Sequence, residues 1–318
     1  MTQTVNPAAR LTSQLVNQVL AIQPLFNLAK QQARRMMQKQ AAAIGVDWMQ
    51  SVAGLRSRGG SQEFAPQWTE ELAAIQNPQL QYPEYYLRPF HAYEQGNLSW
   101  DAAMEVEVAA QAVHARLWQD APEQGSRRLR DNYLQVLKSH LSSDPQAIAD
   151  LGCSVGMTTF ALQACYPNAQ ITGVDLSPYF LAIARYRTQQ CQAQINWIHA
   201  AAESTGLPSA AYDLVSVFLM FHELPQAAAI AVLQEARRLL RPGGYVAITD
   251  VNPCSPVYAK MPPYILTLLK STEPYIDEYF CLNLEQAIVE AGFTPPSVIE
   301  ISPQHRSAIA QLPFVVAE

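Results

Sequence analysis

The residues best placed to do chemistry lie between Ile148 and Gly156. A short apolar run leads through Asp150 into a turn that carries Gly152 and Gly156, and residues 157–166 then have a helical pattern. Glycines let the backbone turn sharply and approach a ligand closely, and open α/β sheets bind ligands at the carboxyl ends of their strands. The stretch therefore predicts a nucleotide-type binding loop between a strand and a helix.

A second short strand ends in Asp175, 19 residues beyond Gly156. A carboxylate at that position can accept both hydroxyls of a ribose. The loop is not a dinucleotide fingerprint, because a G-x-G-x-x-G run needs glycines where Ser154 and Met157 stand. We therefore do not expect it to cradle phosphates.

Together with the turn Arg241-Pro242-Gly243-Gly244, this pattern resembles the class I S-adenosylmethionine-dependent methyltransferases over roughly residues 125–302. The resemblance implies S-adenosylmethionine as the cofactor and is silent on the methyl acceptor. It implies that Asp150 contacts the donor's ammonium group, although this carboxylate could instead cap the loop through backbone N–H groups. The other implied donor contacts are Gly152, Ser154 and Gly156 for the methionine and ribose, Asp175 for the ribose, Leu176 for the adenine, and Phe218 at the end of the fourth strand.

The third strand ends differently from the family pattern, which places there an acidic residue that holds the adenine amino group. This chain instead has His199 followed by three alanines and Glu203. We expect Ala202 and Glu203 to neighbour the adenine, with Glu203 as the substitute carboxylate.

The fourth strand leads into His222 and Glu223, where the reacting centre lies in related folds. Methyl transfer requires an oriented acceptor and, for a hydroxyl or an acidic carbon, the removal of a proton. His222 titrates near neutrality and is our candidate base, with Glu223 orienting the ring or binding substrate. Alternatively, His222 caps the following helix or packs beneath the loop.

Two aromatic segments are candidates for binding the acceptor. Residues 82–100 carry seven aromatic or histidine side chains and two prolines, which exclude a continuous helix. Tyr86, His91 and Tyr93 are their best site candidates, and the alternative is that these rings anchor the N-terminal region. Residues 254–280, which include Tyr264, form an apolar insertion that could bind the acceptor or pair two subunits.

The fold class is α/β: a Rossmann-like, seven-stranded, mostly parallel sheet with helices on both faces and an antiparallel last strand. We divide the chain into a helical N-terminal extension, residues 1–124, and a methyltransferase domain, residues 125–318. Strands are expected at 148–151, 171–175, 195–199, 213–218, 245–250, 297–301 and 306–310. Helices are expected at 11–44 with a break near Pro24, and at 101–117, 126–140, 158–165, 178–190, 226–240 and 284–291, with residues 54–67 as loop.

Composition excludes several classes of protein. The five cysteines are scattered without zinc-ligand spacing, so no metal is expected. No apolar run approaches the roughly 18 residues of a membrane span, which favours a cytoplasmic location. The net charge of −6 argues against nucleic acid as a partner. Residues 1–60 nevertheless carry +6 and residues 61–120 carry −7, so the basic N-terminal helix could contact an anionic membrane, or pack on the protein.

These features predict methyl transfer to a small apolar or aromatic molecule, at an oxygen or carbon atom, by a chain that could form a homodimer. Two alternatives remain at this point: a protein methyltransferase whose extension docks the target, and a donor-binding module without transfer activity.

Overall fold

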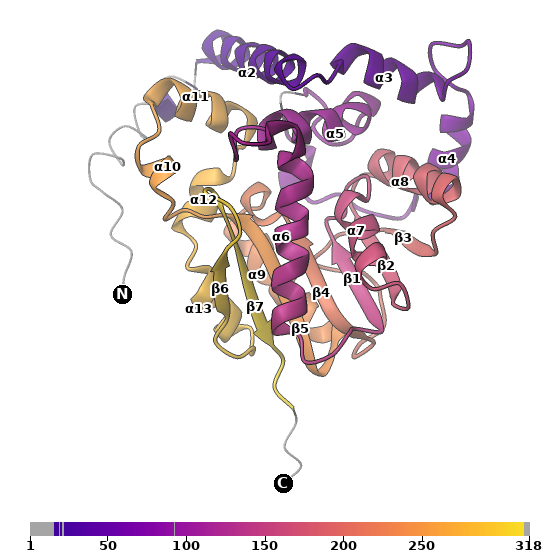
Figure 1. The fold of residues 1–318 in the computed structure, drawn as a ribbon, viewed down its shortest axis with the longest axis vertical. Coiled ribbons are helices and arrows are strands. Elements are labelled where there is room, and N and C mark those ends of the chain that lie inside the picture. The colour runs from indigo at the N-terminus through magenta and orange to yellow at the C-terminus, as the bar shows by residue number, and fades with distance from the viewer. Residues whose placement is uncertain (1–15, 19, 21, 92, 315–318) are drawn as a thin grey trace.

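A seven-stranded sheet forms the centre of the computed structural model, which describes residues 16–18, 20, 22–91 and 93–314 (Figure 1). Its strands are β1 (Ala147–Leu151), β2 (Gln170–Asp175), β3 (Ile195–His199), β4 (Tyr212–Phe218), β5 (Leu240–Val251), β6 (Ser297–Glu300) and β7 (His305–Gln311). Their order is β3-β2-β1-β4-β5-β7-β6. Strands β1 to β5 are mutually parallel and β7 runs antiparallel to β5 and β6, which confirms the predicted fold class.

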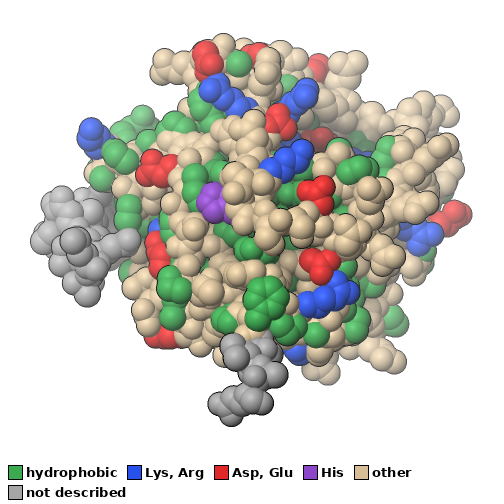
Figure 2. All heavy atoms as spheres, turned by 60° about the horizontal axis from the view of Figure 1, so that its bottom comes forward, with side chains coloured by type: hydrophobic (Ala, Val, Ile, Leu, Met, Phe, Trp, Pro, Cys, Tyr) green, Lys and Arg blue, Asp and Glu red, His purple; other side chains and the backbone are tan. Residues whose placement is uncertain are grey.

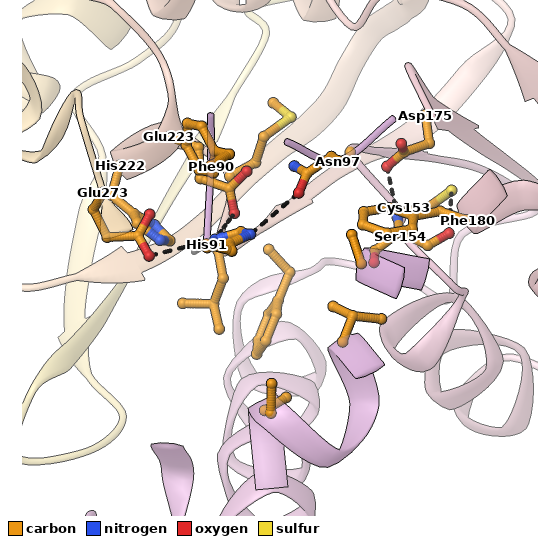
Figure 3. Close-up of a pocket in the computed structure, with 18 of the residues that line it drawn as sticks. Phe90, His91, Asn97, Cys153, Ser154, Asp175, Phe180, His222, Glu223 and Glu273 are labelled. Atoms are coloured by element: carbon orange, nitrogen blue, oxygen red, sulfur yellow. Dashed lines mark hydrogen bonds and ion pairs between the residues drawn. The ribbon is translucent and has the colours of Figure 1, made fainter. Parts of the chain in front are cut away.

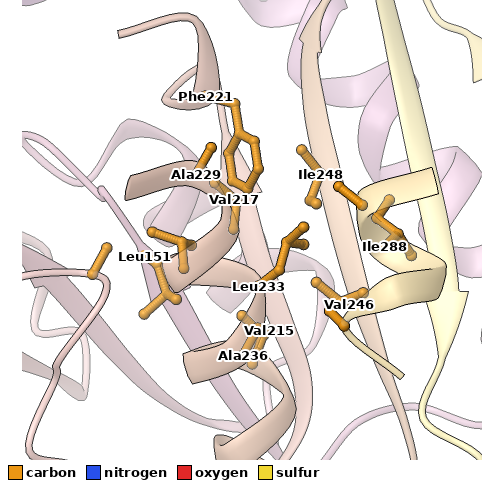
Figure 4. Packing of buried hydrophobic residues seen from close by; sticks show 14 of the residues in the cluster. Leu151, Val215, Val217, Phe221, Ala229, Leu233, Ala236, Val246, Ile248 and Ile288 are labelled. Carbon is orange, nitrogen blue, oxygen red and sulfur yellow. The ribbon is translucent and has the colours of Figure 1, made fainter. Parts of the chain in front are cut away.

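Successive residues of the central strands pack on opposite faces of the sheet, because side chains alternate along a strand. Val215 and Val217 of β4 pack beneath α9 (Gln226–Leu239) and α13 (Leu284–Glu290), as Figure 4 shows. Leu214 points to the other face, where it joins residues of α6 (Gly125–His140) and α7 (Met157–Cys165). Both faces are apolar and covered, as parallel sheets require. The remaining flanking helix is α8 (Pro178–Cys191).

The N-terminal region forms a cap above the carboxyl ends of the strands (Figure 1). It contains α2 (Gln23–Ala43), α3 (Trp48–Ser57), α4 (Gln67–Ile75), η1 (Glu84–Leu87), α5 (Trp100–His114) and η2 (Pro122–Gln124). Helix α2 packs against α5 and against α11 (Pro263–Thr272). The insertion after β5 comprises three helices joined by short turns, α10 (Pro256–Ala259), α11 and α12 (Ile276–Cys281), with η3 (Phe221–Glu223) nearby.

Local sequence signals explain where several helices begin. Pro24 occupies the first turn of α2, where its missing N–H does no harm, and residues 16–18 and 20 before it are helical as well, so the expected break near Pro24 is confirmed. The expected residues 11–15 of that helix lie outside the described residues. Ser99 caps α5 by accepting the Ala102 N–H.

Two local predictions were wrong. Gly54 lies inside α3 and not in a loop, because burial of Trp48 and Val52 outweighs the modest helix penalty of one glycine. Gly243 lies within β5 and not in a turn before it; at φ +85° it forms part of an irregular stretch of the strand.

Four of the six cations at residues 22–60 pair with acids of the following segment, residues 61–120. Lys30 pairs with Glu94, Arg34 with Glu105, Arg56 with Asp101 and Arg58 with Glu71. The opposite charges of residues 1–60 and 61–120 thus hold the two segments together. On the face in Figure 2, basic and acidic side chains are interspersed and form no broad basic patch. Across the described ranges, no helix is long and apolar enough to cross a bilayer.

Candidate active site

A cavity of about 360 Å³ lies between the carboxyl ends of β1, β2 and β4 and the overlying cap helices. That volume is typical of a small-molecule site. The sequence-predicted residues that line it are Tyr86, His91, Tyr93, Asp150, Gly152, Ser154, Asp175, Leu176, Ala202, Glu203, Phe218, His222 and Glu223. Figure 3 shows His91, His222 and Glu223 at one end and Asp175 with Ser154 at the other.

Two predicted site residues do not line the cavity. Gly156 instead starts α7 at φ +85°, and a Cβ there would lie 2.7 Å from the Trp197 ring, so its role is to permit the turn and the close packing behind it. Tyr264 is 65% exposed at the start of α11. The prediction that Tyr264 binds the substrate is therefore corrected, because the side chain faces solvent and not the cavity.

The glycine loop folds back on Asp175. Gly152 has φ +70°, and a Cβ there would lie 2.2 Å from the Met220 sulfur. The Ser154 N–H donates to one Asp175 oxygen at 2.7 Å, and the Ser177 N–H donates to the other at 2.8 Å. Burial raises the pKa of Asp175 to about 7 despite these bonds. The carboxylate is therefore fixed at the cavity wall, and each oxygen keeps a second acceptor lone pair.

Strained backbone gathers around the same cavity. Ser154, His91 and Leu219 all line it and all have positive φ, at 52°, 48° and 57°. Non-glycine residues adopt this conformation at a cost of about 1 kcal/mol or more, and it is concentrated at ligand sites. The strain agrees with a binding function for this wall.

Asp150 is buried at the end of β1. Its oxygens accept hydrogen bonds from Thr159 Oγ1 at 2.6 Å and Ser216 Oγ at 2.9 Å. It binds two hydroxyls rather than the backbone N–H groups that the capping alternative requires. Burial raises the pKa of Asp150 to about 6, because these neutral partners only partly offset desolvation.

Glu203 lies near Leu176 and Ala202 at the other end of the cavity. Tyr85 donates its hydroxyl to Glu203 Oε1 at 2.7 Å, whereas Oε2 is buried without a hydrogen-bond partner among the described residues. An unpaired buried acceptor costs about 1 to 3 kcal/mol. The geometry therefore suits a ligand that presents an N–H donor at this position.

His222 is held by a residue that the sequence pattern did not single out. Its Nδ1 lies 2.7 Å from Asp250 Oδ1 at the end of β5, and its backbone N–H donates to the other oxygen. Burial disfavours the charged imidazole, but the Asp250 carboxylate outweighs it and raises the pKa of His222 to about 9. The orienting role predicted for Glu223 is thus corrected: Asp250 orients the ring.

Glu223 instead faces His91, together with Glu273 of the insertion. The His91 Nε2 lies 3.3 Å from Glu223 Oε1 and 3.4 Å from Glu273 Oε1, and Nδ1 lies 3.2 Å from Asn97 Oδ1. Although burial opposes it, the two carboxylates raise the pKa of His91 well above its usual range. His91 is therefore an imidazolium that joins η3, the insertion and the cap.

The other two predicted aromatics differ in how they meet the cavity. The Tyr93 hydroxyl donates to Glu105 at 2.6 Å, and its ring lies under Arg34, so this residue anchors the cap while one side of its ring lines the wall. Tyr86 lines the cavity between the two ends. Burial raises the pKa of its phenol, and the nearby carboxylates of Asp175 and Glu223 raise it further.

Sequence reasoning missed Arg130, Asp250 and Glu273. Arg130 of α6 lines the cavity and has no ion-pair partner among the described residues; its Nη1 donates to Ser126. Burial lowers its pKa. The signal available for Asp250 was its place at a strand end, next to other strand ends. Arg130 and Glu273 lie in a helix and an insertion whose patterns carry no such signal.

Comparison with known proteins places this site in a family. The family description "Methyltransferase domain" matches residues 148–244. The chain is 31% identical over 183 residues to a ubiquinone biosynthesis O-methyltransferase of Nitrosomonas europaea, covering 54% of this chain and 74% of that protein. It is 36% identical over 105 residues to a trans-aconitate 2-methyltransferase of an Azoarcus species, over 33% and 39% of the two chains. A putative O-methyltransferase of Nostoc punctiforme shares the fold, with a TM-score of 0.52, 20% identity and coverage of 81% and 69%.

The chain belongs to the class I S-adenosylmethionine-dependent methyltransferases. It is a methyltransferase, and S-adenosylmethionine is its methyl donor. The expected donor-binding module without transfer activity is accordingly set aside.

Proposed function

We propose that this enzyme methylates a small, apolar or aromatic molecule at an oxygen or carbon atom. The observation that carries the proposal is the cavity beneath the cap, whose cap side is formed by apolar residues of α2, α5 and α11 such as Met37, Val106 and Leu269. A roof of this kind admits a small ligand and excludes water from the reaction. It leaves little room for a protein acceptor, so the protein methyltransferase alternative is not favoured.

The residues present fit the donor. Asp175 would accept the ribose hydroxyls, and Glu203 Oε2 would accept the adenine amino group. Gly152 and Ser154 would pass close to the methionine portion, with Asp150 near its ammonium group. Arg130, a cation in the wall that has no carboxylate partner among the described residues, would pair with the methionine carboxylate.

The donor supplies a methyl group on a positively charged sulfur, so the protein's own residues need only position the acceptor and manage a proton. We propose that neutral His222, aligned by Asp250, accepts the acceptor's proton. Asp250 then stabilises the imidazolium that forms, since the two groups are 2.7 Å apart.

The donor cradle is tested by calorimetry with S-adenosylhomocysteine. Asp175→Ala should weaken binding at least 10-fold, because a fixed acceptor of two hydroxyls is lost. Asp213→Ala is the matched control, since Asp213 lies at the amino end of β4, away from the carboxyl ends that hold the cavity, and pairs with Arg241. Equal affinity in Asp175→Ala and the parent would refute the assignment.

The acceptor class is tested with radiolabelled donor in cell extract. We expect label in the small-molecule fraction, in a metabolite whose mass rises by one methylene, that is by about 14 mass units. Label confined to a protein band would refute the small-molecule proposal.

The proton-accepting role makes a prediction about pH. Neutral His222 is the active form and its pKa is about 9, so kcat/KM should rise with pH and level off near that value. His222→Gln should lower kcat at least 100-fold and remove this rise. A flat profile, or full turnover by the variant, would exclude His222 as the base.

A further inference from the structure

Glu273 has no role in the proposed donor cradle or in proton removal, yet it lies in the cavity wall next to both histidines (Figure 3). It follows directly after α11 in the insertion, and it is 9% exposed. A carboxylate buried to this extent needs compensating partners. Its contacts therefore indicate what the acceptor end of the cavity is built to bind.

Only one oxygen of Glu273 is satisfied. Oε1 lies 3.4 Å from the His91 Nε2, whereas Oε2 is buried without a hydrogen-bond partner among the described residues. The neighbouring Glu223 shares the same His91 nitrogen through its own Oε1 at 3.3 Å. One imidazole N–H thus serves two carboxylates, and Oε2 of Glu273, a residue of the cavity wall, is left without a donor among the described residues.

The cluster also carries an excess of negative charge. Two imidazoliums, His91 and His222, stand against three carboxylates, Asp250, Glu223 and Glu273. Such a site repels an anionic group and favours a hydrogen-bond donor. Nowhere in the described ranges do three or more side chains form a group able to hold a metal ion, so these carboxylates are not explained as metal ligands.

We propose that Glu273 selects the acceptor by accepting a hydrogen bond from a neutral hydroxyl on an otherwise apolar molecule. This inference rests on the proposed small-molecule function and deepens it. The apolar wall around Leu269, one turn earlier on α11, would hold the hydrocarbon part, while the Glu273 oxygen fixes the position of the hydroxyl. A methyl ether of the same molecule has no O–H to donate and leaves the carboxylate unpaired, and a site built for a hydroxyl rejects such an analogue strongly.

The experiment uses two pairs of probes in which a methyl group replaces the hydroxyl hydrogen: 4-ethylphenol against 4-ethylanisole, and 2-phenylethanol against its methyl ether. The added methyl is present in every comparison, so the change of preference between parent and variant isolates the hydrogen bond. Binding is measured by calorimetry on the full chain saturated with S-adenosylhomocysteine. We expect at least one alcohol or phenol to bind at least 10-fold more tightly than its ether. Glu273→Gln, which replaces the charged acceptor by a neutral amide, should reduce that preference at least 5-fold.

Controls separate this inference from the proposed function. Glu278→Gln, an exposed change in the same insertion, should leave both preferences unchanged. All variants should bind S-adenosylhomocysteine within twofold of the parent; loss of that binding in the parent itself would refute the donor site, not the role of Glu273. Glu273→Ala is the second variant, and a thermal melt of each confirms folding.

Three results would overturn the proposal. The first is equal binding of ether and alcohol, or no binding of either by donor-saturated protein. The second is an unchanged preference in folded Glu273→Gln and Glu273→Ala. The third is tighter binding of 2-phenylethylamine than of 2-phenylethanol, which would assign the cluster to a cationic acceptor.

Discussion

The cap and the sheet region are held together by different forces. The sheet region, residues 125–314, buries continuous apolar strands on both faces, and side chains such as Leu151, Leu214 and Val217 are at most 1% exposed. The cap, residues 22–124, has a smaller core around Trp68 and relies on ion pairs among its segments. Two more pairs tie it to α8, Arg185 to Glu71 and Arg187 to Glu107. The sheet region, called the platform below, is thus held together by apolar burial, whereas the cap depends on ion pairs for its attachment.

The largest expected effect comes from the platform. Leu214→Ala should lower the free energy of unfolding by about 2 to 5 kcal/mol, because Leu214 is fully buried in the central strand and its removal leaves a cavity. Urea denaturation followed by circular dichroism measures it. Leu28→Ala on α2, where the side chain is 61% exposed, is the control and should stay within about 0.5 kcal/mol. Equal losses in both would contradict the comparison.

Low pH should lower the stability of the contact between α5 of the cap and β7 of the sheet region, called the seam below. His114 of α5 and His305 of β7 are buried with ring centroids 5.9 Å apart. Burial lowers the pKa of His114 to about 3 and of His305 to about 4, below the ordinary 6.5. The unfolded chain therefore takes up protons first as the pH falls. The stability that these neutral rings contribute is fully present above pH 6.5 and is lost as the pH falls toward 4 and 3.

The seam is isolated by comparing the parent with His114→Gln. Asp150 and Asp175 titrate in the opposite sense, since their pKa values are raised to about 6 and about 7, and they are common to both proteins. Between pH 7 and pH 5, the parent should lose about 2 kcal/mol relative to the variant, by linkage for one such histidine. Thermal melts across this range test the difference, and parallel curves would show that His114 does not titrate as described.

A smaller effect is expected within the cap. Glu71 is buried between Arg58 and Arg185, so Glu71→Gln should loosen α4 by about 1 to 2 kcal/mol, less at about 1 M salt, where ion pairs are screened. Hydrogen exchange of residues 67–75 measures the local opening. Glu70→Gln, exposed on the same helix, should change little. Faster exchange in the sheet strands as well would show that cap and platform open as one unit.

Much of the platform could be predicted because its signals are local. Strand residues such as Ile195 to His199 were placed correctly, since β-branched runs between turn residues fold in the same way wherever they pack. The glycine loop and Asp175 were brought together because carboxyl ends of adjacent parallel strands share one edge of the sheet. The helices of the insertion and the helical conformation of Gly54 were less predictable, because they depend on packing against residues that are distant in the sequence.

The sequence alone determined the platform: alternating apolar strands, a loop with glycines where φ is positive, and a carboxylate one strand away. It also contained the opposite charges of the first two 60-residue segments, but it could not say whether these charges would face a membrane or each other. Tertiary structure pairs Lys30, Arg34, Arg56 and Arg58 with acids of the second segment. It also makes Asp250 and not Glu223 the partner of His222, and it brings Glu273 to His91. The last two pairings join residues 28 and 182 positions apart, and electrostatic contacts across such separations depend on how whole elements pack, which local patterns do not encode.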